Sequence, residues 1–519
     1  MKYYIYKLSF ILAVFFLLLT ITGCKKFLDT DRQGAYDPEN YPYPSGSGPY
    51  DQFIFGAYND LRAFNLHSQS FIATTSIRSD DADKGSTASD GGANAIDMDN
   101  FPVLPSNGFC NTIWLGAYGL INKANVAIKE IETNTLIIAD EAVKNQTLAE
   151  AKALRAYGYF LLVRLFGNVP IIDKVNDDNV SANNIPQSTP AQTYAFIEQD
   201  LQFAAANLPL TWDAKVFPGR LTMGAANGLL TKVYLQQKKW QQAMATAQQV
   251  MSSGVYNLST SYDMVFREQG ENCPESIFEV QATASNTVPS ANGVQYAQIQ
   301  GVRGSGAWDL GWGWNTPSAQ LEASYEANDP RKDRTILKLS TSSVSRTSIY
   351  GEILPVYNPG GSPPNPQYNG KIHTDPAKRN SVGNRFGYWT NIRILRYPDV
   401  LLMFAEAATE VGGADNITSA RNAVNMVRER ARRGAPVGTL PNITTADAAE
   451  LREAVRKERR AEMGMEHDRF FDLVRWGIAQ DVLNAAGKSN FNNNRDVLLP
   501  IPQTQIDLSA GVLKQNPGY

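Results

Sequence analysis

Three glutamates near the C-terminal end have the spacing of an acid–base site. Glu458, Glu462 and Glu466 recur every fourth residue, so a helix would place them on one face. Paired carboxylates cleave glycosidic bonds when one of them holds a proton at working pH. The arginines that crowd this stretch are Arg456, Arg459, Arg460 and Arg469. Because neighbouring guanidinium groups lower the pKa of a carboxyl, we expect structural ion pairs here rather than a general acid.

Other chemical motifs in the chain are incomplete. The stretch 487–489, Gly-Lys-Ser, hints at a phosphate loop, but Val482 stands where that loop needs its first glycine. The stretch Asp80–Gly85 hints at a calcium loop, but Gly92 stands where the bidentate glutamate belongs. The three histidines are far apart and show no metal-ligand spacing. We therefore predict a protein without cofactor, metal or enzymatic activity.

Aromatic and polar residues gather around a glycine-rich segment, residues 301–321. A sugar ring has an apolar face that suits a flat aromatic ring, and hydroxyls that suit a few polar side chains. Glycines let the backbone approach such a ligand closely. The candidate ligand-binding residues in this region are Trp308, Tyr296, Arg303 and Asp309. We expect Trp308→Ala to lower ligand affinity without unfolding the protein.

A second candidate cluster lies earlier in the chain, in a region poor in helical periodicity. Its ligand-binding candidates are Phe64, Asp80, Asp81 and Asn100. The two clusters are about two hundred residues apart in the sequence.

The N-terminus has the pattern of a bacterial lipoprotein leader. Lys2 and Lys7 precede an apolar block, residues 8–21, which is shorter than a membrane-spanning helix. The block ends in Ile-Thr-Gly-Cys, which resembles a lipobox with Cys24 as the acylated residue. Two or more acyl chains make a stable membrane anchor. The rest of the chain has no second apolar run of spanning length, so we expect a globular body held to a membrane by lipid.

The net charge and the cysteine content limit the possible binding partners and disulfide bonds. The 519-residue chain has a formal net charge of −3, so we expect no nucleic-acid partner. After lipidation of Cys24, Cys110 and Cys273 remain, and the sequence does not decide whether they pair.

Helical periodicity dominates two long parts of the sequence. We expect one helix at 113–131, and another in which Leu154 to Leu165 form an apolar stripe that ends at Gly167. A further helix begins around Pro398 and ends at Gly412, and another spans about 448–465.

The segment Leu221–Gly254 has the 34-residue length of a tetratricopeptide repeat. Ala243 and Ala247 would let its two helices approach closely, although Thr231 stands where the repeat usually has glycine.

Five stretches in order resemble the SusD/RagB family of lipoproteins. They are Cys24–Asp29 (CKKFLD), Trp312–Trp314 with Asn328–Arg331, Arg396–Ala407 (RYPDVLLMFAEA), Glu458–Gly477, and the C-terminal pair Leu499–Pro502 and Gln515–Tyr519. The departures are small: Pro398 stands where alanine is commoner, and Ser509–Gly511 replaces a frequent asparagine. We expect Trp312 and Trp314, as family positions, to serve mainly in holding the fold.

The resemblance implies a mainly α fold of tetratricopeptide-like helical hairpins with a loop-rich second part. It implies an outer-membrane lipoprotein, facing outward, that captures a nutrient and delivers it, as a lid, to a TonB-dependent SusC-like transporter. The ligand would most often be a glycan. A peptide ligand, a surface glycosidase and a structural scaffold for other proteins remain open alternatives.

The expected organisation follows from these signals. We predict a signal peptide at 1–23, an anchor and tether at 24–49, a helical region at 50–258 and a C-terminal region at 259–519. The last region divides into a loop-rich part (259–387), a helical part (388–480) and a tail (481–519).

Overall fold

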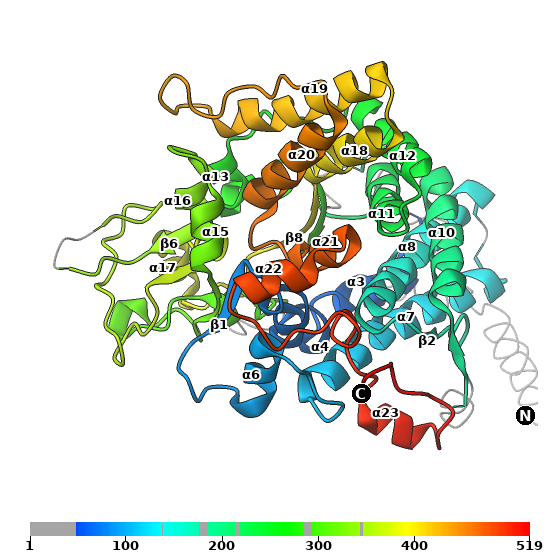
Figure 1. Ribbon diagram of the computed structural model, residues 1–519. Coiled ribbons are helices and arrows are strands. Elements are labelled where there is room, and N and C mark those ends of the chain that lie inside the picture. The colour runs from blue at the N-terminus through cyan, green and yellow to red at the C-terminus, as the bar shows by residue number, and fades with distance from the viewer. Residues whose placement is uncertain (1–47, 138, 176–183, 213–217, 285–291, 343–345) are drawn as a thin grey trace, which may run out of the picture. The chain divides into compact units, whose positions relative to one another are not determined.

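The computed structural model describes all residues except 1–47, 138, 176–183, 213–217, 285–291 and 343–345 (Figure 1). The chain divides into two compact units, Met1–Pro49 and Tyr50–Tyr519, and the account below concerns the second. The predicted signal peptide, Cys24 and most of the tether lie outside the described residues.

Consecutive helices of the first half pack against one another in chain order (Figure 1). They are α7 (Gly108–Thr133), α8 (Glu141–Phe166), α10 (Pro190–Asn207), α11 (Met223–Gln236) and α12 (Trp240–Ser252). This arrangement confirms the predicted mainly α fold of helical hairpins.

The helices α11 and α12 form the hairpin predicted at 221–254. Ala243 and Ala247 are fully buried, which allows the close approach of the two helices. Thr231, at the repeat's usual glycine position, donates its hydroxyl to the Asn227 carbonyl and lies 2.9 Å from the Thr246 hydroxyl. A hydrogen-bonded threonine pair therefore replaces the bare backbone contact that glycine would make.

A second helical group continues the array after the loop-rich part. It comprises α18 (Tyr397–Val411), α19 (Ala414–Ala431), α20 (Ala448–Met463), α21 (Arg469–Trp476) and α22 (Ala479–Ala485). The helix α18 packs against α12, so the two groups share one core. As predicted, Pro398 lies in the first turn of α18 and Gly412, at φ +74°, ends it.

Short strands and short helices lie both within the loop-rich part, 259–387, and elsewhere in the chain. The described strands form four antiparallel pairs: β1 (Ala82–Gly85) with β5 (Trp314–Pro317), β2 (Val169–Pro170) with β3 (Gln187–Ser188), β4 (Ser276–Val280) with β8 (Ile392–Arg396), and β6 (Ile336–Lys338) with β7 (Gln367–Asn369). The remaining short helices are α3 (Asp51–Asp60), α4 (Phe64–His67), α5 (Gln69–Ile72), α6 (Gly92–Asn100), α13 (Tyr262–Val265), α14 (Tyr296–Gln300), α15 (Ala319–Ser324), α16 (Arg331–Thr335), α17 (Pro376–Val382) and α23 (Gln503–Leu508).

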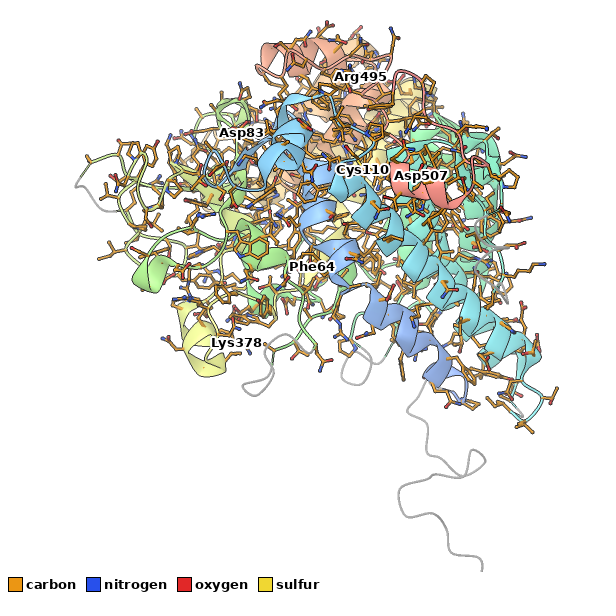
Figure 2. The ribbon with its side chains drawn as sticks, turned by 90° about the horizontal axis from the view of Figure 1, so that it is seen from below. Phe64, Asp83, Cys110, Lys378, Arg495 and Asp507 are labelled. Atoms are coloured by element: carbon orange, nitrogen blue, oxygen red, sulfur yellow. The ribbon has the colours of Figure 1, made fainter. Side chains whose placement is uncertain are left out.

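The C-terminal tail returns to the start of α7. Figure 2 shows α23, which carries Asp507, beside the end of α7 that carries Cys110. The Gln505 side chain donates to Asn111 at 2.8 Å, which joins the two helices. Cys110 and Cys273 are both free thiols.

Candidate functional site

A surface cavity of about 750 Å³ lies where the early region meets the glycine-rich segment. Its lining residues are Gln69, Asp90, Gly91, Arg303, Gly304, Ser305, Gly306, Asp309, Gly311, Trp312 and Trp314. Volumes of this order are typical of small-ligand sites. The early region and the glycine-rich segment therefore meet here, but the early region contributes Gln69, Asp90 and Gly91 rather than the residues of its predicted cluster.

The pairing of β1 with β5 builds this cavity. Gly85 lies opposite Trp314, and the next amide, that of Ser86, donates to the Gly313 carbonyl at 2.6 Å. Gly85 has φ +71°, and a Cβ there would lie 2.5 Å from the Gly313 carbonyl oxygen. Only glycine fits this crossing, which carries the chain from β1 toward Asp90.

An ion pair of Asp90 with Arg303 forms the polar wall of the cavity. Asp90 Oδ2 accepts from Arg303 Nη1 at 2.6 Å, from Ser86 Oγ at 2.6 Å and from Trp314 Nε1 at 3.2 Å. Burial alone would raise the pKa of Asp90, but these hydrogen bonds and the Arg303 charge outweigh it and lower that pKa. Asp90 is therefore a stable anion at neutral pH.

Both partners of this pair keep polar atoms available. Among the residues that the structure describes, Asp90 Oδ1 and Arg303 Nη2 make no hydrogen bond, and their side chains are 32% and 38% exposed. A carboxylate oxygen only accepts and a guanidinium only donates, whereas a hydroxyl does both. Adjacent ligand hydroxyls can thus donate to Asp90 and accept from Arg303.

Trp312 supplies an apolar wall beside these polar groups. Its ring is half-buried against the main core while lining the cavity. Its amide donates to the Gln298 carbonyl at 2.8 Å, which fixes the backbone. Trp314, only 2% exposed, packs edge-on against Phe109 and also lines the cavity. Trp314 thus holds the fold as predicted, whereas Trp312 is only half-buried.

The loop that carries Asp90 is organised by an internal ammonium group. Lys84 Nζ donates to the carbonyls of Gly85, Thr87 and Asp90 at 3.2, 2.8 and 3.2 Å. The sequence of this stretch hinted at a calcium loop, but here the lysine ammonium lies among the three carbonyl oxygens. In the described part of the chain, no cluster of three or more His, Cys, Asp or Glu side chains could hold a metal ion.

Asp99 anchors this loop to the C-terminal region. One carboxylate oxygen accepts from the Lys84 amide at 2.8 Å and the other from Lys488 Nζ at 2.6 Å. Lys488 also donates to the carbonyls of Ile77 and Ala82, at 2.5 and 2.9 Å. The lysine of the incomplete phosphate-loop motif therefore has a structural role.

The predicted residues of the glycine-rich region separate into two groups. Arg303 and Asp309 line the cavity, and Asp309 is paired with Arg385 at 2.6 Å. Trp308 lies outside the cavity lining, with its ring stacked on His373 at 5.8 Å between centroids. Tyr296 is buried, and its hydroxyl lies 2.5 Å from His467 Nε2. The burial of Tyr296 places it in the core, away from the cavity lining.

The predicted residues of the early cluster do not line the cavity. Asp80 and Asp81 are each 2% exposed and pair with Arg469 and Arg460 at 2.8 and 2.7 Å. The sequence could not indicate this burial, because the arginine partners come from the far end of the chain. Asn100, at the end of α6, and Phe64, at the start of α4 (Figure 2), are exposed elsewhere.

Several cavity residues were not predicted from the sequence, among them Asp90 and Gln69, and neither was the position of Trp312 in the cavity wall. Asp90 precedes two glycines, a turn signal that marks a loop tip. That signal identifies an exposed position, but only the β1–β5 pairing brings it beside Arg303.

The three glutamates lie in a buried ionic network, as predicted, although α20 ends at Met463 and Glu466 lies beyond the helix. Glu458 pairs with Arg331 and Arg428 at 2.5 and 2.9 Å, and Glu466 pairs with Lys371 at 2.5 Å. Burial of Glu462 is outweighed by Arg430 and Arg396, which lower its pKa. A carboxyl with a lowered pKa is a poor proton donor at neutral pH.

The arginines named from the sequence pair with other acids. Arg459 binds Asp399 and Asp472, and Arg456 binds Glu453. Local spacing thus correctly predicted that the glutamates form ion pairs. It did not predict their partners, which come from distant elements.

Comparison with known proteins identifies the family. The family model described as "SusD family" matches residues 274–519, and that described as "Starch-binding associating with outer membrane" matches residues 51–235. The chain belongs to the SusD/RagB family. It is 29% identical to "SusD-like protein P2" of Formosa agariphila over 99% of both chains.

Solved structures of SusD-like proteins share the fold. A "Laminarin binding SusD-like protein" superposes with a TM-score of 0.74 and 28% identity, covering 92% of this chain and all of that chain. "Surface glycan-binding protein A from Bacteroides fluxus" superposes with a TM-score of 0.73 and 25% identity, covering 92% of this chain and all of that chain. As in the sequence analysis, none of the helices in the described residues is both long and apolar enough to cross a membrane.

Proposed function

We propose that this SusD/RagB protein is an outer-membrane lipoprotein that binds a glycan in the Asp90–Arg303–Trp312 cavity. It is anchored through acylated Cys24 and passes its ligand to a TonB-dependent SusC-like transporter. The observation that carries the proposal is the cavity itself. In it an aromatic ring lies beside a hydrogen-bond acceptor, Asp90 Oδ1, and a donor, Arg303 Nη2, that are not engaged by other described residues. The glycan ligands named for similar SusD-like structures support the same ligand class.

The cavity lacks the arrangement that a glycosidase needs. Its two carboxylates, Asp90 and Asp309, are each paired with an arginine at 2.6 Å. A general acid must hold a proton at neutral pH, and the lowered pKa of Asp90 favours its ionised form. The site therefore holds its ligand unchanged, which agrees with a capture role.

The test is isothermal titration of Trp312→Ala against the wild-type chain with a panel of oligosaccharides. Loss of the stacking surface removes about 0.5–1.5 kcal/mol beyond the area that the ring buries, so we expect affinity to fall about tenfold or more. Trp308→Ala is the matched control, because that indole lies in the same segment but outside the cavity. Equal affinity of the wild type and Trp312→Ala would remove the cavity from the proposal.

Three further measurements address the anchor, the partner and the ligand class. Cys24→Ala should lose fatty-acid labelling and membrane association, and the wild-type chain should co-purify with a β-barrel transporter. A peptide library titrated in parallel separates glycan capture from peptide capture, since binding only to peptides would redirect the proposal to that ligand.

A further inference from the structure

The charges around the cavity are compensated in pairs. Arg303 contacts Asp90 at 2.6 Å, and Arg385 contacts Asp309 at 2.6 Å. Arg385 also donates to the Gly306 carbonyl at 3.4 Å, so it belongs to the same loop. Lys84, a further cation in the loop that carries Asp90, is 8% exposed and directs its ammonium group to three backbone carbonyls. No described cation at the cavity is left without a compensating partner.

We propose that this cavity selects neutral glycans and discriminates against those carrying carboxylate or sulfate groups. The inference rests on the proposed function and names its substrate class. Sites that recognise carboxylate or sulfate present a guanidinium fork free for bidentate binding. Here an anion that approached Arg303 would also stand beside Asp90, and one that approached Arg385 would stand beside Asp309. Like-charge juxtaposition of this kind is the usual device for rejecting a wrong partner.

A neutral polyol meets no such penalty. Its hydroxyls can donate to the free oxygen of Asp90 and accept from the free nitrogen of Arg303 while the ion pair stays intact. The apolar face of a sugar ring can lie on Trp312, where an added charge would lose hydration without gaining a partner. The same residues thus favour hydroxyl-rich ligands and disfavour charged ones.

The experiment titrates the full mature chain with neutral and anionic oligosaccharides of equal length. The neutral panel contains gluco-, manno- and xylo-oligosaccharides, and the anionic panel contains oligouronates and sulfated oligosaccharides. We expect binding within the neutral panel, with an affinity that changes less than about twofold when salt shortens the Debye length from about 20 Å to about 5 Å. Each anionic ligand should bind at least about tenfold more weakly than the best neutral one.

The variant Asp309→Asn leaves Arg385 without its carboxylate and makes the prediction sharper. It should raise the ratio of oligouronate to neutral affinity severalfold at low salt, and the gain should vanish at high salt because screening weakens exposed charges. Asp333→Asn is the matched control, because Asp333 is an exposed acid 3.7 Å from Arg346, away from the cavity lining. It should leave the ratio unchanged.

The outcomes separate the two proposals. Tighter binding of an anionic ligand to the wild-type chain, or an unchanged ratio in Asp309→Asn, would overturn the neutral selectivity while leaving glycan capture in place. An absence of binding in both panels would instead refute the proposed function and this inference with it.

Discussion

Two buried histidines should make the stability of this protein depend on pH. His67 Nδ1–H donates to the Leu61 carbonyl at 2.7 Å, and its Nε2 accepts from the Tyr157 hydroxyl at 2.7 Å. His467 lies 3.0 Å from the Thr75 hydroxyl and 2.5 Å from that of Tyr296. Both rings are satisfied as neutral imidazoles, so a proton added to either one disturbs a complete set of hydrogen bonds.

The direction of the effect follows from the pKa values. Burial lowers the pKa of His67 to about 4 and that of His467 to about 3, from 6.5 in the unfolded chain. Below pH 6.5 the unfolded state therefore binds more protons, and stability falls as pH decreases toward these values. At pH 5 each histidine costs about 2 kcal/mol, since one pKa unit corresponds to about 1.4 kcal/mol. Together they cost about 4 kcal/mol, or about 4 °C of melting temperature at this chain length.

Other groups titrate in the same range, so the test uses a difference between variants. Burial raises the pKa of Glu271 to about 7, which stabilises the folded state as pH falls below 7 and opposes the histidines. Carboxyls with lowered pKa, such as Glu462 and Glu466, lose their contribution only as pH falls through about 4 and below. Variant and wild type share these groups, so their contributions cancel in the comparison.

The assay is differential scanning calorimetry at pH 8 and pH 5 of the wild type and of a double variant, His67→Gln with His467→Gln. Glutamine keeps one donor and one acceptor but does not titrate. The drop in melting temperature from pH 8 to pH 5 should be about 4 °C smaller in the double variant, and each single variant should show about half of that. Identical pH dependence in all four proteins would refute the reasoning.

Three substitutions test the packing of α7 and the loop that carries Asp90. Gly116→Ala in α7 would place a Cβ 2.3 Å from the Asn65 carbonyl oxygen and should lower the free energy of unfolding by about 1–3 kcal/mol. Gly119→Ala is its matched control, because its Cβ meets only the Asp60 carboxylate, at 3.2 Å, and it should raise that free energy by about 0.5–1 kcal/mol. Calorimetry should show opposite shifts in melting temperature, and equal shifts would contradict the prediction. Lys84→Met removes the ammonium group from the Asp90 loop and should weaken glycan binding about tenfold in titration, and an unaltered affinity would show that the loop holds its shape without it.

Local sequence patterns predicted most of the helical framework. The hairpin of α11 and α12 followed from the small residues Ala243 and Ala247, and the bounds of α18 followed from Pro398 and Gly412. These signals depend on neighbours within a few turns, so they survive in any tertiary context. The domain boundaries stay a prediction.

The site was predicted only in part because its geometry depends on distant pairs. Arg303 and Asp309 were found because glycines surround them, but Asp90 reaches Arg303 only through the β1–β5 pairing. Sequence spacing cannot tell that Trp312 faces a cavity while Trp314 is buried two residues later. Nor can it show that Trp308 stacks on a histidine sixty-five residues away.

Asp80 and Asp81, which the sequence predicted to contact a ligand, have a structural role in the fold. Asp80 and Asp81 hold one end of the loop that carries Asp90 to Arg469 and Arg460. Asp99 holds the other end of this loop to Lys488. Buried pairs of this kind contribute little net stability, but breaking one is costly, so they restrict the loop to one arrangement. A loop restricted at both ends presents Asp90 to Arg303 before any ligand arrives. Because binding then loses less conformational entropy, a few hydroxyl contacts and one aromatic ring suffice for useful affinity.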